Sequence, residues 1–128
     1  MPLHTVTLNY DPAKADFPFG PNPRSLMVKP NDIIEFKIGE STLEKQAGCR
    51  LRITFHRDRH FSRSVLQHPP GQGGSALSVT VLPGAAPGTP KGRITAYRCE
   101  LLDADGELID GLSSDGESGG EIVPDTGG

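Results

Sequence analysis

Residues 92–111 read GRITAYRCELLDADGELIDG, and this stretch predicts two strands joined by a tight turn. Its first half alternates with a period of two, as a strand does when one of its faces is buried. One face carries Thr95, Tyr97, Cys99 and Leu101, and the other carries Arg98 and Glu100. Asp105 and Gly106 tolerate the positive φ angles that a short hairpin turn requires. The stretch therefore predicts a β-hairpin with one face in the core.

Short segments with the same alternation recur along the rest of the chain. They are Leu3 to Tyr10, Leu26 to Val28, Ile33 to Ile38, Arg50 to Phe55, Leu77 to Val81, and Ile122 with Val123, the last of these as an edge strand. Sixteen glycines and twelve prolines punctuate the chain, so long helices are not expected. The pattern predicts an all-β fold, an antiparallel two-sheet β-sandwich of seven or eight strands with Greek-key connections.

The connections between these segments differ in character. Phe17 to Pro23 holds three prolines, which remove backbone donors, and is predicted as a loop that covers one end of the core. Gly39 to Gly48 is polar and has room for one helical turn. His56 to Gly74 is a long irregular connection of the kind that is often functional. The length of 128 residues suits one domain, and we predict a sandwich over 1–123 and a flexible tail over 124–128.

Charge is distributed unevenly along the chain. All thirteen Lys and Arg residues lie at or before Arg98, together with seven Asp and Glu residues, which gives a balance of +6. The remainder carries nine carboxylates and no base, a balance of −9. The two parts should attract each other, so the acidic part neutralises some of any basic surface. This weakens the inference to a nucleic-acid partner.

Targeting signals give a simple expectation. No apolar run approaches the roughly 20 residues that a helix needs to cross a bilayer. Met1 to His4 leads directly into a strand pattern, without the basic and apolar segments of an export signal. We therefore expect a cytoplasmic protein of bacterial type with no membrane partner.

Two motifs resemble those of the cupredoxins. Residues 26–36, LMVKPNDIIEF, are similar to the V-x-x-G-D-x-V-x-F segment of that family, with Asn31 in place of the usual glycine. Residues 92–99, GRITAYRC, are similar to the G-x-Y-x-Y-x-C strand that carries the copper thiolate. The resemblance spans most of the chain and implies a cupredoxin-like β-sandwich.

The copper site that this resemblance implies is incomplete here. Cys99 matches the thiolate position, and His56 or His60 could match the first imidazole. A blue-copper site also needs a second His and usually a Met after the Cys, but the chain has no His after His68 and no Met after Met27. We therefore expect no cofactor. A divergent metal site of His56, His60 and Cys99 remains an alternative.

An immunoglobulin-like sandwich is the alternative fold. In such domains a Tyr stands two residues before the second Cys, as Tyr97 does before Cys99. Cys49 and Cys99 could then form a disulfide. The chain has no Trp and no export signal, and a reducing cytosol keeps thiols reduced, so we favour two buried thiols.

One basic cluster could form an interaction surface. Its members are Arg50, Arg52, Arg57, Arg59, His60 and Arg63. It could bind an anion or nucleic acid, but an RNA-binding sheet places aromatic side chains on the same face as its bases, and Phe55 points away from Arg50 and Arg52 by parity. We favour pairing of these arginines with Glu35, Glu100 or the acidic tail, and nucleic acid is not expected as a partner.

Catalytic motifs are missing from the sequence. Ser113 and Ser114 lack a nucleophile-elbow motif, and the calcium-loop pattern that begins at Asp103 has Leu101 and Leu112 where oxygen ligands are needed. An enzyme is therefore not expected. We predict a non-catalytic binding or assembly module that contacts a protein partner or itself through an edge strand and the His56 to Gly74 connection.

Overall fold

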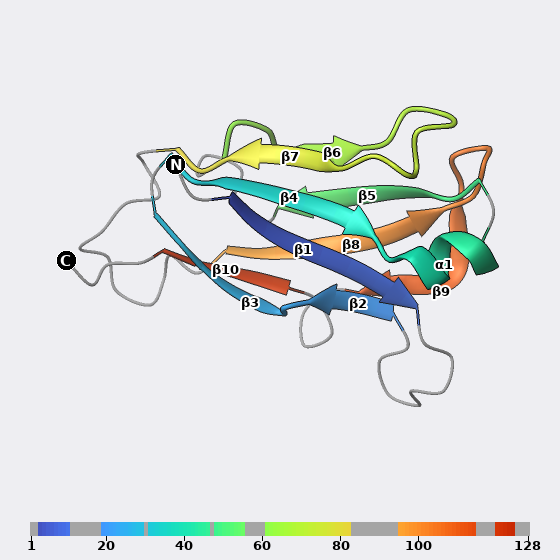
Figure 1. Ribbon diagram of the computed structural model, residues 1–128, viewed down its shortest axis with the longest axis horizontal. Helices are drawn as coiled ribbons and strands as arrows, with labels where there is room; N and C mark the ends of the chain where they lie inside the picture. The colour runs from blue at the N-terminus through green and yellow to red at the C-terminus, as the bar shows by residue number, and fades with distance from the viewer. Residues whose placement is uncertain are drawn as a thin grey trace.

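The computed structural model describes residues 3–10, 19–29, 31–46, 48–55, 61–82, 95–114 and 120–124. These residues form ten strands and one short helix (Figure 1). In chain order they are β1 Leu3–Tyr10, β2 Phe19–Asn22, β3 Ser25–Val28, β4 Ile33–Ile38, α1 Glu40–Lys45, β5 Arg50–Phe55, β6 Val65–Gln67, β7 Leu77–Thr80, β8 Thr95–Leu102, β9 Leu108–Ser114 and β10 Gly120–Pro124.

The strands form two packed sheets, which confirms the all-β sandwich. Sheet A has the order β2-β1-β4-β7, and sheet B has the order β3-β10-β8-β5-β6, with β9 paired to β8 beside β10. Most neighbours are antiparallel, as predicted, but β1 with β4 and β3 with β10 are parallel. The ten strands of the described residues exceed the predicted seven or eight, because β2 and β6 lie in segments that were predicted as loops.

The hairpin predicted for 92–111 is confirmed where the structure describes it. Tyr97, Cys99 and Leu101 are fully buried on the inner face of β8. The turn closes when the Asp103 amide donates to the Glu107 carbonyl at 2.8 Å, and Gly106 within it has a φ of 87°. A positive φ of this size favours glycine, so the Asp-Gly pair of the sequence decides where the chain reverses.

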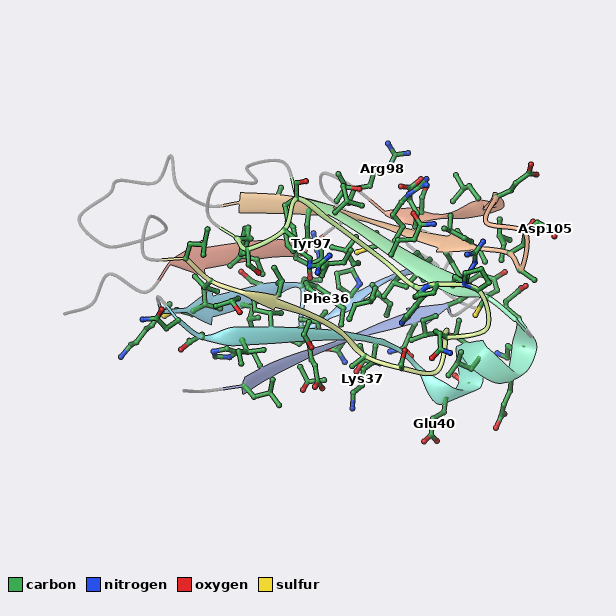
Figure 2. The ribbon with its side chains drawn as sticks, turned by 90° about the horizontal axis from the view of Figure 1, so that it is seen from above. Phe36, Lys37, Glu40, Tyr97, Arg98 and Asp105 are labelled. Atoms are coloured by element: carbon green, nitrogen blue, oxygen red, sulfur yellow. The ribbon has the colours of Figure 1, made fainter. Side chains whose placement is uncertain are left out.

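Aromatic rings join the two sheets at the centre of the core. Phe36 from β4 and Tyr97 from β8 come from opposite layers, and their ring centroids lie 5.3 Å apart in an edge-to-face arrangement (Figure 2). Phe55 lies 6.0 Å from each of these rings and stacks on Phe61 at 4.3 Å. Because aromatic rings bury large areas in such geometries, this cluster contributes to the packing of the two layers.

The segment 17–23 corrects the sequence prediction. Phe19 to Asn22 is a strand of sheet A, and Phe19 is buried with 1% exposure, so it belongs to the core instead of a covering loop. Pro21 is compatible with this strand because β2 is at the end of sheet A, where the missing backbone donor breaks no ladder.

The segment around Ile122 also departs from prediction. β10 was expected as an edge strand, but it lies between β3 and β8 inside sheet B. Ile122 is buried, and Gly120 sits directly beneath the Tyr97 ring, where a Cβ atom would collide with that ring. A glycine therefore lets β10 approach the aromatic cluster. The predicted helical turn between Gly39 and Gly48 is confirmed as α1.

Candidate functional site

The alternative metal site cannot be assembled from the described residues. Cys99 lies in the core with 0% exposure, directly opposite Ile53 of β5. His56 and His60 lie outside the described residues, so their part of the prediction stays a prediction. Within the described part of the chain, no group of three His, Cys, Asp or Glu side chains could hold a metal ion.

The two cysteines are buried thiols and form no disulfide, as we favoured. Cys99 faces Ile53, and Cys49 precedes β5 four residues earlier, so the two lie about 13 Å apart along the strands. Burial raises the pKa of the Cys49 thiol. Both cysteines therefore act as small apolar side chains.

The outer face of sheet B carries a compact charged group. Arg52 donates two hydrogen bonds to the Glu100 carboxylate, from Nε to Oε1 and from Nη2 to Oε2, each at 2.9 Å. Arg98 approaches the same carboxylate, with Nε at 3.9 Å from Oε1. The hydrogen bonds to Glu100 raise the pKa of Arg52. The predicted pairing with Glu100 is confirmed for Arg52, whereas Glu35 pairs with Lys37 on sheet A.

Arg50 behaves differently from Arg52, although both point outward from β5. Its residue exposure is only 6%, because the β8–β9 turn lies over it. A Cβ atom on Gly106 would collide with the guanidinium, and the guanidinium donates long hydrogen bonds to the carbonyls of Asp103 and His68. Arg50 is therefore part of the structure at this end of the sandwich and is not available to an external anion.

Of the remaining members of the basic cluster, Arg63 is the one within the described residues. Arg63 is exposed before β6, and Arg57, Arg59 and His60 lie outside the described residues. Figure 2 shows Arg98 pointing away from the core on the outer side of the sandwich. On this face Arg52 and Arg98 share the Glu100 carboxylate.

His68 ties the connection between β6 and β7 to β5. Its Nδ1 accepts the Leu51 amide at 3.0 Å, and its Nε2 donates to the Ser75 carbonyl at 2.6 Å. Because Nδ1 accepts a hydrogen bond, the imidazole is neutral. Burial lowers the pKa of His68, and the hydrogen bond with Ser75 only partly opposes this. The hydrogen bonds of His68 thus fix the described part of the 56–74 connection to β5.

The edge strands of the two sheets are the next candidate surfaces. Three of them have a feature that hinders pairing with a further strand. β2 contains Pro21, which removes a backbone donor. Beside β7, Phe61 bridges Val81 and the Ser62 amide donates to the Thr80 carbonyl. β6 has only three residues. Short strands, prolines and covering segments are the usual means by which proteins block edge pairing.

Among the described residues, β3 shows none of these protections. It has four residues, Ser25 to Val28, with no charge and no proline, and β10 is its single neighbour among the described strands. Met27 projects from it with 60% exposure, the highest of the large exposed apolar side chains in the described residues. Leu26 is half-buried and Val28 is buried, so the strand itself is anchored in the core.

A hydrogen-bonded turn fixes the end of β3. Asn31 adopts a φ of 75°, and the Asp32 carboxylate accepts the Lys29 amide at 2.9 Å and contacts His4 Nε2 at 2.8 Å. Burial acts to raise the pKa of Asp32, but these hydrogen bonds and the nearby positive charges outweigh it, so the pKa is lowered. The turn holds β3 at a fixed position relative to β1 and β4.

The sequence pattern predicted Leu26 to Val28 as a strand, but it assigned no functional role to this strand or to Met27. The signal was present, because Leu26 and Val28 alternate with Ser25 and Met27, and an apolar side chain on the outward face of a short strand is unusual. What the sequence lacks is strand order. Only the sheet order shows that β3 is at the end of sheet B.

Comparisons with known proteins give no family. No family model matches the chain, and no curated protein matches it. Among solved structures, a cysteine protease inhibitor from Entamoeba histolytica is similar over 97% of this chain and 96% of its own, at 15% identity and a TM-score of 0.47.

Two further structures are similar over most of their length. The Cu(I) form of an amicyanin variant covers 94% of this chain and 82% of its own, at 12% identity and a TM-score of 0.41. The N-terminal domain of a phage TP901-1 protein covers 97% of this chain and 98% of its own, at 12% identity and a TM-score of 0.44. In the described residues, no helix has the length and apolar character needed to cross a membrane.

Proposed function

We propose that the protein is a non-catalytic binding module that receives an extended segment of a protein partner along β3. The observation that carries this proposal is the contrast among the sheet edges, since β3 combines an uncharged strand with a 60% exposed Met27. Adding a strand to an open edge is a common mode of peptide recognition, in which backbone hydrogen bonds give affinity and alternate side chains give specificity.

The position of β3 suits this role. Along an edge strand, every second residue turns its N–H and C=O groups away from its neighbour, and these groups can pair with a new strand. β3 is held on its other side by β10 and at its end by the Asp32 turn. A strand that is already in place loses little conformational entropy when a partner binds.

The charged face of sheet B is a weaker candidate for the binding surface than β3. Arg52 and Arg98 already share Glu100, so an anionic ligand would compete with a carboxylate held in place by the sheet. The accompanying proposals are a cupredoxin-like topology and a cytoplasmic location. The first is supported by Asn31, which stands where the cupredoxin motif usually has a glycine. Its φ of 75° lies in the region that glycine favours.

Site-specific photo-crosslinking tests the proposal. A benzophenone amino acid would replace Met27 on β3 in one variant and Gln67 on β6 in the other, because both positions are exposed on short strands at sheet edges. Irradiation of cells that express each variant should yield discrete adducts from position 27 and far fewer from position 67. Equal adducts from the two positions, or adducts from position 67 alone, would contradict the assignment to β3.

A further inference from the structure

We infer that residues 69–75 form a pH-sensitive lid over one edge of β5, and that neutral His68 holds this lid closed. The inference goes beyond the proposed function and does not depend on β3. It is carried by the hydrogen bonds of His68, which link the lid to the edge of β5. Figure 1 shows the connection between β6 and β7 reaching the end of the sandwich where α1 lies.

The imidazole of His68 takes the place of a backbone carbonyl in the ladder between β5 and β6. The two strands pair in register as far as Arg52 and Gln67, and His68 comes next. The Leu51 carbonyl accepts a hydrogen bond from the His68 amide at 3.1 Å, as in a regular antiparallel pair. The Leu51 amide, however, donates to Nδ1 of the ring at 3.0 Å, while the His68 carbonyl accepts from Arg50 Nη1 at 3.5 Å. This pair of the ladder is therefore closed by a side chain that can bind a proton.

The same ring joins the lid to the sandwich. Nε2 of His68 donates to the Ser75 carbonyl at 2.6 Å. In the described part of the chain, the other hydrogen bonds of 69–75 run within the lid, from Gln72 to Pro69 and from Ser75 to Gln72. Gly73 is the buried residue of the lid, and a Cβ atom there would collide with the Cys49 carbonyl of the chain before β5. The closed lid thus depends on the ring and on one close glycine contact.

Protonation of His68 is incompatible with this arrangement. A protonated imidazole has two N–H donors and no acceptor. Its Nδ1–H would face the Leu51 N–H across 3.0 Å, donor against donor, so the ring has to leave this position. The Ser75 carbonyl then loses its donor, and the Leu51 amide loses its acceptor. Acid therefore opens the lid and uncovers the edge of β5 at Leu51.

The groups around His68 favour its neutral form in the closed lid. β6, β7 and the lid contain no titratable group besides His68 itself. β5 and the residue before it contribute Arg50 and the Cys49 thiol, and the β8–β9 turn contributes Asp103, whose carbonyl accepts from Arg50. No carboxylate of the described residues forms an ion pair with His68. Burial lowers the pKa of His68, so the closed lid is favoured above the ordinary pKa of about 6.5 and is lost as the pH falls below it toward the lowered value.

An NMR titration of the full ¹⁵N-labelled chain from pH 7.5 to pH 5.0 tests the inference. At pH 7.5 a scalar coupling through the hydrogen bond should join the Leu51 nitrogen to Nδ1 of His68. The heteronuclear NOE, which reports fast backbone motion, should show rigid amides at Gly71, Gln72 and Gly74. As the ring of His68 is protonated, the coupling should vanish and these amides should become mobile with the same midpoint. The amides of 103–107 in the β8–β9 turn should stay rigid.

Two neighbouring glycines provide matched variants. In Gly73→Ala the new Cβ collides with the Cys49 carbonyl and destabilises the closed lid, whereas a Cβ at Gly74 meets nothing within 4 Å. Because closure of the lid and protonation of His68 oppose each other, weakening the lid must raise the pKa of His68. The midpoint of the ring should therefore rise toward about 6.5 in Gly73→Ala and stay at the wild-type value in Gly74→Ala. The lid amides of Gly73→Ala should already be mobile at pH 7.5.

Three results would overturn the inference. Equal midpoints in the wild type and both variants would show that the lid and the ring are not linked. A protonated ring beside rigid lid amides would show that protonation does not open the lid. Mobility that appears in the lid and in the β8–β9 turn together would show general unfolding instead of local opening. None of these results concerns β3, so the proposed function would stand or fall by its own crosslinking test.

Discussion

The β5–β8 ladder and the β3 edge belong to the same sheet, but they differ in how their outward side chains are partnered. In the ladder, Glu100 lies directly opposite Arg52 and binds it through two hydrogen bonds, and the β8–β9 turn covers Arg50. At the edge, Met27 is 60% exposed and β10 is the single described neighbour of β3. The charged groups of the ladder are thus bound to one another, whereas the exposed side chain at the centre of the β3 edge is the apolar Met27. Function is therefore better sought at the edge than among the arginines.

Removing the shared carboxylate should have the largest effect on stability. Glu100→Gln leaves Arg52 with a neutral partner and leaves Arg98 without its nearby charge, so the free energy of unfolding should fall by about 2 kcal/mol. Denaturant unfolding measures this change. Glu35→Gln is the matched control, because Glu35 forms an exposed pair with Lys37 at 3.6 Å, and its loss should change stability by less than about 0.5 kcal/mol. Equal losses would show that the ladder pair is no stronger than a surface pair.

Acidification should have the next largest effect on stability, through His68. Burial lowers the pKa of His68 in the folded protein, so the unfolded chain binds its proton more readily. The stability that neutral His68 contributes is complete above the ordinary pKa of about 6.5 and is lost as the pH falls from there toward the lowered folded value. Between pH 7.5 and 5.5 the free energy of unfolding should therefore decrease by about 1 kcal/mol. In His68→Gln the protein should be less stable at pH 7.5 and should lack this share of the pH dependence, and an unchanged slope would refute the role of His68.

The hydroxyl of Tyr97 should matter little or should even be unfavourable. It is buried without a hydrogen-bond partner among the described residues, and burial raises its pKa. Tyr97→Phe keeps the ring contacts with Phe36 and Phe55 and removes an unsatisfied polar group, so stability should stay equal or rise by up to about 1 kcal/mol. Thermal unfolding measures this. Tyr97→Leu, which loses the ring contacts, should be clearly destabilised. A large loss in Tyr97→Phe would instead reveal a partner for the hydroxyl.

Changing the open edge should have the smallest effect on stability. Met27→Lys replaces an exposed side chain with the kind of charge that blocks edge pairing in other proteins, so unfolding should change by less than about 0.5 kcal/mol. Binding of a partner strand along β3 should nevertheless weaken severalfold. A destabilised variant with unchanged partner binding would show that Met27 serves the structure and not binding.

The local elements were largely predictable because their causes are local. Period-two alternation marked β1, β4, β5 and β8, and Asp105 with Gly106 marked the turn that follows. The strands that were missed carry weak local signals. β2 contains Gly20 and Pro21, and β6 has three residues, so each exists because a neighbouring strand holds it.

The candidate site was less predictable because it depends on contacts between distant residues. The sequence grouped Arg50 with Arg52, but the turn over Gly106 buries Arg50 and leaves Arg52 to pair with Glu100. It also expected Ile122 at an edge, whereas β10 fills the place between β3 and β8. Parity along a strand shows which face a side chain occupies, but it does not show what covers that face.

The amino-acid pattern was sufficient to predict the two-sheet class of the fold, the inward face of β8 and the position of its turn. These follow from side-chain alternation and from the conformational freedom of glycine, which act over a few residues. The sequence did not reveal that β3 is at the end of a sheet, that Met27 is exposed or that Arg50 is enclosed, because these depend on how the strands assemble. Strand order depends on which distant segments pair, and the free energy of that pairing is shared by the whole core.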